Sequence, residues 1–389
     1  MKLSFDNTQK AFAHKSTADL IKARRLFQLF AYPFIVDKGP ILANVALRIG
    51  LPIKGIIKKT IFHQFCGGED IESSLESAKE LYLNGVGAIL DYSVEGEGSE
   101  SSYDRTFKEL LAVINYTAEH EEFPFAVFKC TGLGPLEVMR KLTEGEVLSE
   151  SEQLKFNAFE ERVDGLCKAA YQNNIQIFID AEESWIQDCI DLLSYQMMEK
   201  YNSERAVVYN TIQLYRKDRV DEIRKQIVIA KSKGYHVGFK LVRGAYMEKE
   251  GERALELGYP NPIQDSKSDT DLDYNRAVEL CFEHRNIVSI CAGTHNEGSS
   301  ELLANLIHEA EIDKNDGRFW FAQLYGMSDH ISFNLVSEGF NVAKYLPYGP
   351  VKEVLPYLAR RAQENSAVKG QTGRELELIK RELERRLNH

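Results

Sequence analysis

The sequence lacks several patterns that would place a protein in a familiar class at once. No run approaches the roughly 18 uninterrupted apolar residues that a membrane-spanning helix needs. The six cysteines form no CxxC pair and no metal-type cluster, so we expect buried, reduced thiols and no metal site. No GxGxxG follows an early apolar run, since neither Gly67-Gly68 nor the EGEG at 95–98 fits it, which argues against a Rossmann dinucleotide fold.

A surplus of positive charge is also lacking. The chain carries 59 acidic and 48 basic residues, a net charge of −11, which disfavours nucleic acid as a partner because phosphates require a basic footprint. A local basic pocket for a small anion remains compatible with this balance. The 389 residues suffice for one large barrel or two ordinary domains.

The N-terminal region has no apolar core of the kind found in secretory signals. Residues 10–35 combine bases with aromatics, as a transit peptide or a surface anchor does. Acidic residues and a cap-type Ser16 or Thr17 favour an ordinary amphipathic helix instead. Since no acid-free transit segment is present, we expect a bacterial cytoplasmic protein rather than a mitochondrial one.

Short runs rich in β-branched and aromatic residues recur along the chain, with helical periodicity between them. Such alternation predicts parallel strands, and eight units in about 270 residues suit a closed (β/α)₈ barrel. An open doubly wound sheet is the competing architecture. The eight runs are 62–66, 86–93, 125–132, 175–182, 206–213, 236–244, 287–295 and 318–326.

Polar side chains concentrate at or near the C-terminal ends of these runs. In a barrel those ends form one face, where catalytic residues gather from several strands. One charged strand end usually means a solvated loop, but many together favour an enzyme. The residues concerned are Asp91, Lys129, Asp180, Gln213, Lys240, Arg243, His295 and Gln323.

Two of these segments have features suited to an anionic ligand. Lys240 and Arg243 are three positions apart, so both cannot point inward from one regular strand. We expect one to face the interior and the other to lie where the strand ends before Gly244. The GTHN at 293–296 precedes a helix, whose N-terminus with Thr294, His295 and Asn296 suits phosphate or pyrophosphate. A plain N-cap with a packed histidine is the alternative.

The segment 345–365 predicts a helix on which Tyr357, Arg360, Arg361 and Glu364 share one stripe. Paired guanidinium groups suit a small carboxylate, which each can hold through two parallel hydrogen bonds. A solvated basic patch with an intrahelical Arg–Glu pair is the alternative. The tail 371–389 predicts a charged amphipathic helix, of a kind more often solvated than packed.

Taken together, six segments resemble the proline dehydrogenase family, including the corresponding domain of bifunctional proline utilization proteins. The segments are FKCTGL (128–133), IDAEE (179–183), KLVRGAY (240–246), GTHN (293–296), QLYGM (323–327) and YLPYG to YLARRAQEN (345–365). The resemblance implies a distorted (β/α)₈ barrel that binds FAD, with the last helix over the active face. It also implies N-terminal helices at 1–59, a catalytic barrel at 60–366 and a C-terminal helix or tail at 367–389.

The same resemblance implies roles for individual residues. Arg360, Arg361 and Lys129 would hold the substrate carboxylate, and Asp180 and Glu364 would position those cations. The pyrrolidine ring would be lined by Tyr246, Leu324, Tyr345 and Tyr357. Contacts to FAD would come from Gln213, Lys240, Arg243, Ala245, Thr294, His295 and Asn296. Met247, where many bacterial relatives carry Trp, leaves the flavin contact at that position open.

The implied reaction is oxidation of L-proline to Δ1-pyrroline-5-carboxylate, with hydride transfer from C5 to flavin N5 and electrons passed to a quinone. Tyr345 favours proline over hydroxyproline, although a hydroxyproline dehydrogenase remains an alternative. A quinone acceptor implies peripheral membrane contact, through residues 22–32 or the terminal helix. Two further alternatives are a Schiff-base aldolase with Lys129 as nucleophile and a non-catalytic regulatory or DNA-binding protein, although the net negative charge disfavours DNA.

Overall fold

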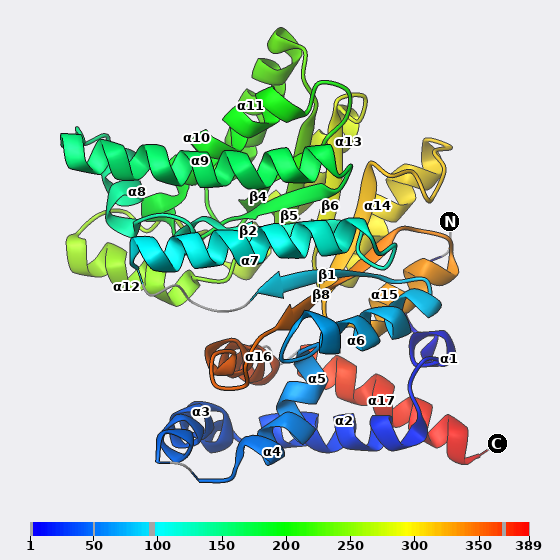
Figure 1. Ribbon diagram of the computed structural model, residues 1–389. Coiled ribbons are helices and arrows are strands. Elements are labelled where there is room, and N and C mark those ends of the chain that lie inside the picture. Colours follow the sequence, from blue (N-terminus) through cyan, green and yellow to red (C-terminus); the bar gives the residue numbers. More distant parts are fainter. Residues whose placement is uncertain (1–2, 50, 93–97, 368–370, 389) are drawn as a thin grey trace. The chain divides into compact units, whose positions relative to one another are not determined.

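Eight parallel strands form a closed barrel in chain order in the computed structural model. Figure 1 draws the helices and strands of the chain. The structure describes residues 3–49, 51–92, 98–367 and 371–388. The strands are rich in Val, Ile and Phe and largely buried, as expected for a sheet covered on both faces. They are β1 Gly87–Tyr92, β2 Phe125–Lys129, β3 Gln176–Asp180, β4 Val208–Gln213, β5 Val237–Val242, β6 Val288–Gly293, β7 Phe319–Leu324 and β8 Val342–Tyr348. The predicted α/β barrel is confirmed.

The prediction was wrong about one strand and missed another. The aromatic run 62–66 is helical, with a π-helical turn at Lys58–Phe62 followed by α5 His63–Phe65. Its Phe62 and Phe65 are buried in a helical core cluster, so its apolar content reflects helix packing. The eighth strand is instead β8, VAKYLPY, in which Lys344 interrupts the apolar run.

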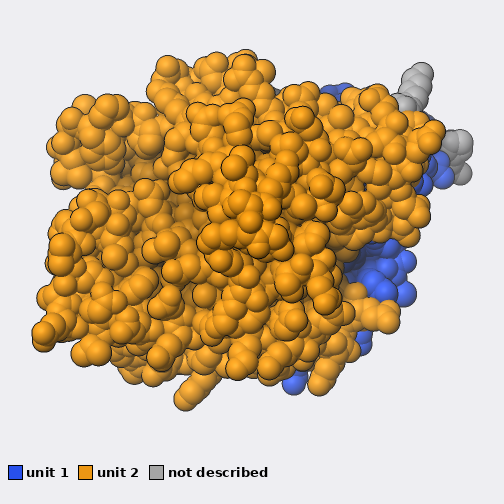
Figure 2. Space-filling view, turned by 90° about the horizontal axis from the view of Figure 1, so that it is seen from above, with its two compact units in different colours: residues 1–95, 323–389 blue, residues 96–322 orange. Residues whose placement is uncertain are grey.

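The chain forms two compact units, coloured separately in Figure 2. The first, unit 1, comprises residues 1–95 and 323–389, and the second, unit 2, comprises residues 96–322. The N-terminal and C-terminal helices therefore group with β1 and β8. The domain boundaries expected at 59/60 and 366/367 stay a prediction. Each unit is described by itself below.

Unit 1 has an aromatic core formed by helices from both ends of its sequence. Phe27 and Phe30 pack around Phe65, with ring centroids 6.3 and 6.1 Å from it. Ser16 caps its second helix as expected, accepting a hydrogen bond from the Asp19 amide. The helices of eight residues or more are α2 Thr17–Phe30, α3 Pro33–Arg48, α6 Ile71–Leu83, α15 Asp329–Ser337, α16 Leu355–Ala367 and α17 Gln371–Leu387.

The C-terminal helix α17 is packed, contrary to the expectation of a solvated tail. Its apolar stripe of Leu378, Ile379 and Leu383 is buried in the core of unit 1. The Arg386 guanidinium donates to the carbonyls of Phe12 and Lys15, at 2.8 Å each. The tail therefore holds the N-terminal helices, and its apolar face is not available to a membrane.

A buried ionic cluster reinforces the same attachment. The carboxylate of Asp329, at the start of α15, lies 2.5 Å from the Lys15 ammonium and 2.9 Å from that of Lys344 on β8. Burial alone would raise the pKa of Asp329, but these two ammonium groups hold it well below its usual range. Loss of one partner would leave a buried charge uncompensated, so the cluster ties residue 15 firmly to the β8 region.

Unit 2 carries β2 to β6, the first residues of β7 and the helices between them. The barrel strands begin with packed rings, since Phe125 stacks on Phe178 at 4.2 Å and meets Tyr209 edge-on at 5.7 Å. Its helices of eight residues or more are α7 Glu100–Ala118, α8 Leu136–Thr143, α9 Glu150–Gln172, α10 Ser184–Tyr201, α11 Arg219–Lys233, α12 Met247–Leu257, α13 Lys267–Glu283 and α14 Glu297–Glu309.

All six cysteines are buried and unpaired, which confirms the expectation of reduced thiols. Burial raises the pKa of Cys189 to about 12, so this thiol stays protonated at neutral pH. Among the residues that the structure describes, no helix combines the length and apolarity needed to cross a bilayer.

Candidate functional site

A charged cluster lies at the C-terminal ends of strands in unit 2. Lys129 and Asp180 are register partners at the ends of β2 and β3, and the Lys129 ammonium lies 3.3 Å from the Asp180 carboxylate. Lys240, buried on β5, pairs with the other oxygen of the same carboxylate. Burial alone would raise the pKa of Asp180, but Lys240 and Lys129 hold it below its ordinary value.

Lys240 and Arg243 divide as their spacing requires. Lys240 lies within the strand and is buried, 5.0 Å above the ring of Phe178. Arg243 follows the last residue of β5 and is half-buried. The next residue, Gly244, has φ +127°, and a Cβ there would meet the Tyr215 ring at 2.5 Å. Only glycine fits this turn, which fixes where the chain leaves the strand.

Arg243 is held by a set of side chains from two outer helices. Its guanidinium donates to Asp271 of α13 at 2.6 Å, to the Thr294 hydroxyl at 2.6 Å and to Ser299 of α14 at 3.0 Å. Its Cζ atom lies 4.3 Å from the centre of the Tyr274 ring. The arginine is therefore preorganised before any ligand arrives.

The GTHN segment forms the N-terminal entry to α14, a helix of 13 residues. The Asn296 side chain accepts from the Ser299 amide at 2.9 Å, so Asn296 is the N-cap. Thr294 is buried, and its hydroxyl oxygen also accepts from the Asn296 amide at 3.1 Å. His295 is half-buried. Asn296 therefore has the role of a plain N-cap, as in the alternative interpretation of this segment. The positive N-terminal end of α14 lies next to Arg243.

Glu182 is a buried acid that the sequence reasoning left out. Both of its oxygens accept hydrogen bonds from Thr131, one from the amide at 2.9 Å and one from the hydroxyl at 2.5 Å. The Gln213 side chain donates to the Glu182 carbonyl at 2.6 Å. Burial raises the pKa of Glu182 to about 7. Its position two residues after Asp180 was the available signal, because alternate residues share a face.

The segment after Gly244 is anchored through α12. Ala245 is exposed and Tyr246 is half-buried; burial raises the pKa of the Tyr246 phenol, so it stays neutral. Within α12, the buried Glu250 carboxylate accepts from the amide and hydroxyl of Ser184, at 2.6 and 2.5 Å. This contact caps the N-terminus of α10 and holds α12 in place.

The predicted helix over Tyr357–Glu364 is present in unit 1 as α16. Arg361 is buried, donates to Glu364 at 2.5 Å and lies 5.0 Å from the centre of the Tyr357 ring. Arg360, in contrast, is exposed. Burial raises the pKa of Glu364, an effect that Arg361 and Arg360 oppose. The two arginines, treated alike in the sequence, thus differ in environment.

Two buried polar atoms on α16 have no hydrogen-bond partner among the described residues. They are the Tyr357 hydroxyl and Nε of Arg361. Leaving a buried donor unsatisfied costs about 1–3 kcal/mol, so such pairs usually await a ligand or water. Tyr345, on β8, is buried and its carbonyl accepts from the Tyr325 amide at 2.8 Å, while Leu324 at the end of β7 is half-buried.

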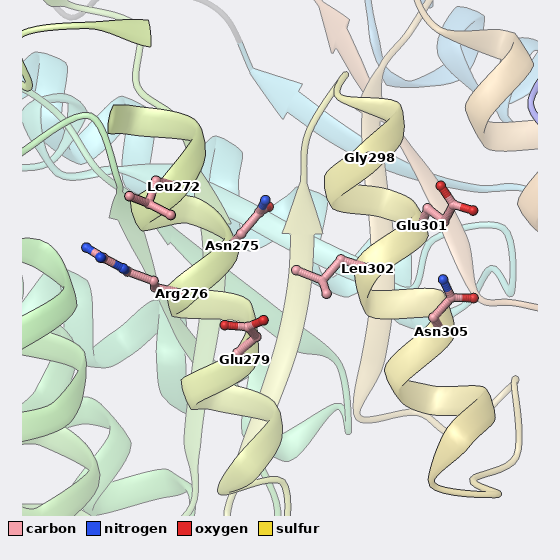
Figure 3. Close-up of a pocket in the computed structure, with 8 residues that line it drawn as sticks. All are labelled: Leu272, Asn275, Arg276, Glu279, Gly298, Glu301, Leu302 and Asn305. Atoms are coloured by element: carbon pink, nitrogen blue, oxygen red, sulfur yellow. The ribbon is translucent and has the colours of Figure 1, made fainter. Parts of the chain in front are cut away.

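The structure therefore groups the predicted residues within each unit. Lys129, Asp180, Gln213, Lys240, Arg243, Ala245, Tyr246, Thr294, His295 and Asn296 belong to unit 2, whereas Leu324, Tyr345, Tyr357, Arg360, Arg361 and Glu364 belong to unit 1. A groove between α13 and α14 contains none of them (Figure 3). Its Asn275 accepts from Ser299 at 2.7 Å, so this outer wall supports the residues that hold Arg243.

Comparison with known proteins gives one consistent result. The profile of the proline dehydrogenase family matches residues 74–374. The mitochondrial proline dehydrogenase 1 of Dictyostelium discoideum is 31% identical over 99% of this chain and 75% of its own length. The corresponding Arabidopsis thaliana protein is 30% identical, over 99% of this chain and 87% of its own.

A solved structure supports the fold. Proline utilization A from Bdellovibrio bacteriovorus, inactivated by N-propargylglycine, superposes with a TM-score of 0.75 at 17% identity. The match covers 93% of this chain and 42% of that longer one. At this identity the likeness concerns the barrel architecture alone.

The relatives overturn one expectation. The proteins from Dictyostelium and Arabidopsis are named as mitochondrial, which contradicts the prediction of a bacterial cytoplasmic protein. That prediction relied on the composition of residues 10–35, in which acidic residues and a cap-type serine were taken to exclude a transit peptide.

Proposed function

This chain belongs to the proline dehydrogenase family, and we propose that it oxidises L-proline to Δ1-pyrroline-5-carboxylate with FAD as its cofactor. The observation that carries the substrate assignment is the pair of unsatisfied buried donors on α16, the Tyr357 hydroxyl and Nε of Arg361. A guanidinium and a phenol beside each other suit a small carboxylate. The buried apolar neighbours Val354 and Leu358 suit an aliphatic ring.

The residues of unit 2 fit a flavin dinucleotide in the chemistry of their donors. Lys240 and Arg243 supply two cations on and just after one strand, and the N-terminus of α14 with Thr294 supplies a positive helix end. Gln213, buried at the end of β4, adds an amide. When bound, FAD would supply the acceptor for the hydride that leaves C5 of proline.

The chain's own residues contribute binding, orientation and electrostatics. No protein nucleophile is needed, because the lone pair of the free ring amine assists the departure of hydride. Arg361 would fix the carboxylate and thereby the face of the ring, a placement that can supply several kcal/mol. Lys240 would favour negative charge on the ring of a reduced flavin, and Asp180 would hold the Lys240 ammonium in position. Buried aromatic side chains such as Tyr357 would exclude water.

The electron acceptor is proposed to be a quinone, on family resemblance. A hydroxyproline dehydrogenase is the closest alternative, and Tyr345 on β8 favours the unsubstituted ring. The aldolase alternative gains no support from the geometry, because Lys129 forms an ion pair with Asp180 and an ion-paired ammonium is a poor nucleophile.

The test is an absorbance spectrum of the purified protein before and after anaerobic addition of L-proline, repeated with trans-4-hydroxy-L-proline. We expect bound flavin that proline bleaches and hydroxyproline bleaches more slowly. A protein that takes up no FAD, or whose flavin stays oxidised with proline, would refute the proposal.

A further inference from the structure

Helix α3 of unit 1 presents an apolar stripe that nothing in the described structure covers. Phe34, Ile41, Leu42 and Ile49 are 58–70% exposed, and Val45 is 50% exposed. Residues at these spacings fall on one face of a helix. The opposite face is occupied, since Val36 is buried and Ala43 packs against the core of unit 1.

The stripe continues into the next segment, where Leu51 and Ile56 are 49% and 65% exposed. Ten of the 23 large hydrophobic side chains that are exposed among the described residues lie between Leu29 and Ile56. The other thirteen are scattered over the rest of the chain. Single exposed apolar residues are ordinary, whereas a contiguous patch marks an interaction surface.

The charge of this region is opposite to that of the protein. Residues 22–59 contain eight lysines and arginines and a single acid, Asp37, a net +7 within a chain of −11. Lys38 falls within the exposed stripe, and Lys59 is exposed beyond it. Lys54 and Lys58 share Glu69 at 2.8 and 2.7 Å, so one acid offsets part of the charge.

We propose that α3 and the segment to Ile56 form a docking surface for a bilayer that contains anionic lipid. A helix with an apolar face, flanking bases and a lysine able to extend its stem toward headgroups has the properties of an interfacial helix. A second copy of this chain fits less well. A symmetric contact would place Lys38 and its basic surroundings opposite themselves, and like charges repel.

This surface replaces the two candidates that the sequence suggested. The aromatics of α2, Phe27 and Phe30, are buried in the core, and the apolar stripe of α17 is packed beneath them. The sequence analysis did not single out α3, and its unoccupied face is evident only in the structure. The proposal concerns binding and stands whether or not the assigned reaction is correct.

The experiment is co-sedimentation of the full chain with phosphatidylcholine vesicles, with and without phosphatidylglycerol. We expect binding to the anionic vesicles that weakens with added salt and is slight with phosphatidylcholine alone. The variant Phe34→Ser/Ile41→Ser/Ile49→Ser should bind at least about tenfold more weakly. The control Leu83→Ser/Val147→Ser/Leu154→Ser removes three apolar side chains elsewhere that are at least as exposed, and it should bind like the unaltered chain.

A second measurement places the helix in the lipid. Phe34→Trp adds an indole to Trp185 and Trp320, and brominated lipid should quench its emission when vesicles are present. Far-ultraviolet circular dichroism and thermal unfolding, measured on every variant, show that the chain remains folded. Absence of binding to anionic vesicles, or equal binding by the Phe34 triple variant, would overturn the proposal. So would a dimer in light scattering that this variant dissociates, because a second copy would then occupy the face.

Discussion

The predicted site residues of the two compact units differ in how their buried polar groups are satisfied. In unit 2 the charged residues of the predicted site already have partners, with Asp180 between Lys129 and Lys240 and Arg243 bonded to Asp271. In unit 1 the Tyr357 hydroxyl and Nε of Arg361 are buried without a hydrogen-bond partner in the described structure. One group is complete before a ligand binds and the other is not. The difference indicates a preorganised electrostatic frame in unit 2 and a ligand-completed site in unit 1.

Among the variants considered, Asp180→Asn should have the largest effect on the charged site residues of unit 2. The change leaves Lys240 buried without its counter-charge, and we expect a loss of about 3–5 kcal/mol in the free energy of unfolding at neutral pH. Because the folded pKa of Asp180 lies below the unfolded value, this stabilisation is lost as the pH falls through about 4 and below. Urea unfolding at pH 7 and at acidic pH measures both effects.

The matched control is Asp180→Asn/Lys240→Met, which removes both charges. It should be less destabilised than Asp180→Asn alone, since no buried charge is left unpaired. If the single variant is as stable as the unaltered protein, Asp180 does not compensate Lys240.

Arg361→Ala tests the ligand-completed side. Loss of the buried guanidinium should weaken transition-state binding by about 2–5 kcal/mol and lower kcat/KM for proline accordingly. The flavin content should change little. Arg361→Lys should recover part of the lost kcat/KM, since an ammonium restores the charge without the fork. Arg360→Ala should cost less because that side chain is exposed, and Arg276→Ala, on the outer groove of Figure 3, should cost nothing. Equal losses for Arg361 and Arg276 would remove the assignment.

Glu182 should make the stability of the folded chain depend on pH. With its folded pKa raised to about 7 from 4.5, the folded chain holds a proton that the unfolded chain releases between those values. Stability should therefore decline by about 1–3 kcal/mol as the pH rises from 4.5 to 7 and above. Glu182→Gln, which mimics the protonated acid, should flatten this dependence in urea unfolding, and the exposed Glu204→Gln should not. An unchanged slope in Glu182→Gln would contradict the burial argument.

The smallest expected effect on stability concerns two tyrosines. The hydroxyl of one has no hydrogen-bond partner in the described structure, and the hydroxyl of the other donates to a carboxylate. Tyr357→Phe removes an unsatisfied hydroxyl, so it should leave stability unchanged or raise it by up to about 1 kcal/mol, while lowering kcat/KM several-fold. Tyr201→Phe removes a hydroxyl that donates to Asp164 at 2.7 Å, and should lower stability by about 1 kcal/mol without affecting turnover. Thermal unfolding and steady-state kinetics of both variants measure these effects. The same changes in stability and turnover in both variants would mean that the Tyr357 hydroxyl has no ligand.

Much of the fold was accessible from the sequence because parallel strands are buried on both faces and therefore form apolar runs. Seven of the eight runs are strands. The run 62–66 was wrongly predicted as a strand because five residues, three of them apolar, are too few to show a period that separates a strand from a packed helix. The strand β8 was missed because its Lys344 interrupts the apolar run, and the structure pairs that lysine with Asp329, fifteen positions away.

The sequence identified the residue types of the candidate site but not the environment of each side chain. The helical spacing of Tyr357 and Arg361 was correct, yet the sequence could not separate buried Arg361 from exposed Arg360, since both are arginines on one helix. The partners of Arg243, Asp271 and Ser299, lie 28 and 56 positions away on other helices. Only tertiary packing brings them to the strand end.

The central claim is that the buried donors of Tyr357 and Arg361 receive a carboxylate during oxidation of a five-membered ring. The most direct measurement compares anaerobic flavin reduction by L-proline and by L-prolinamide, which keeps the ring amine and removes the negative charge. We predict rapid bleaching by proline and reduction at least about 100-fold slower by the amide, the equivalent of losing a buried charge pair. Equal rates for the two compounds would contradict the account.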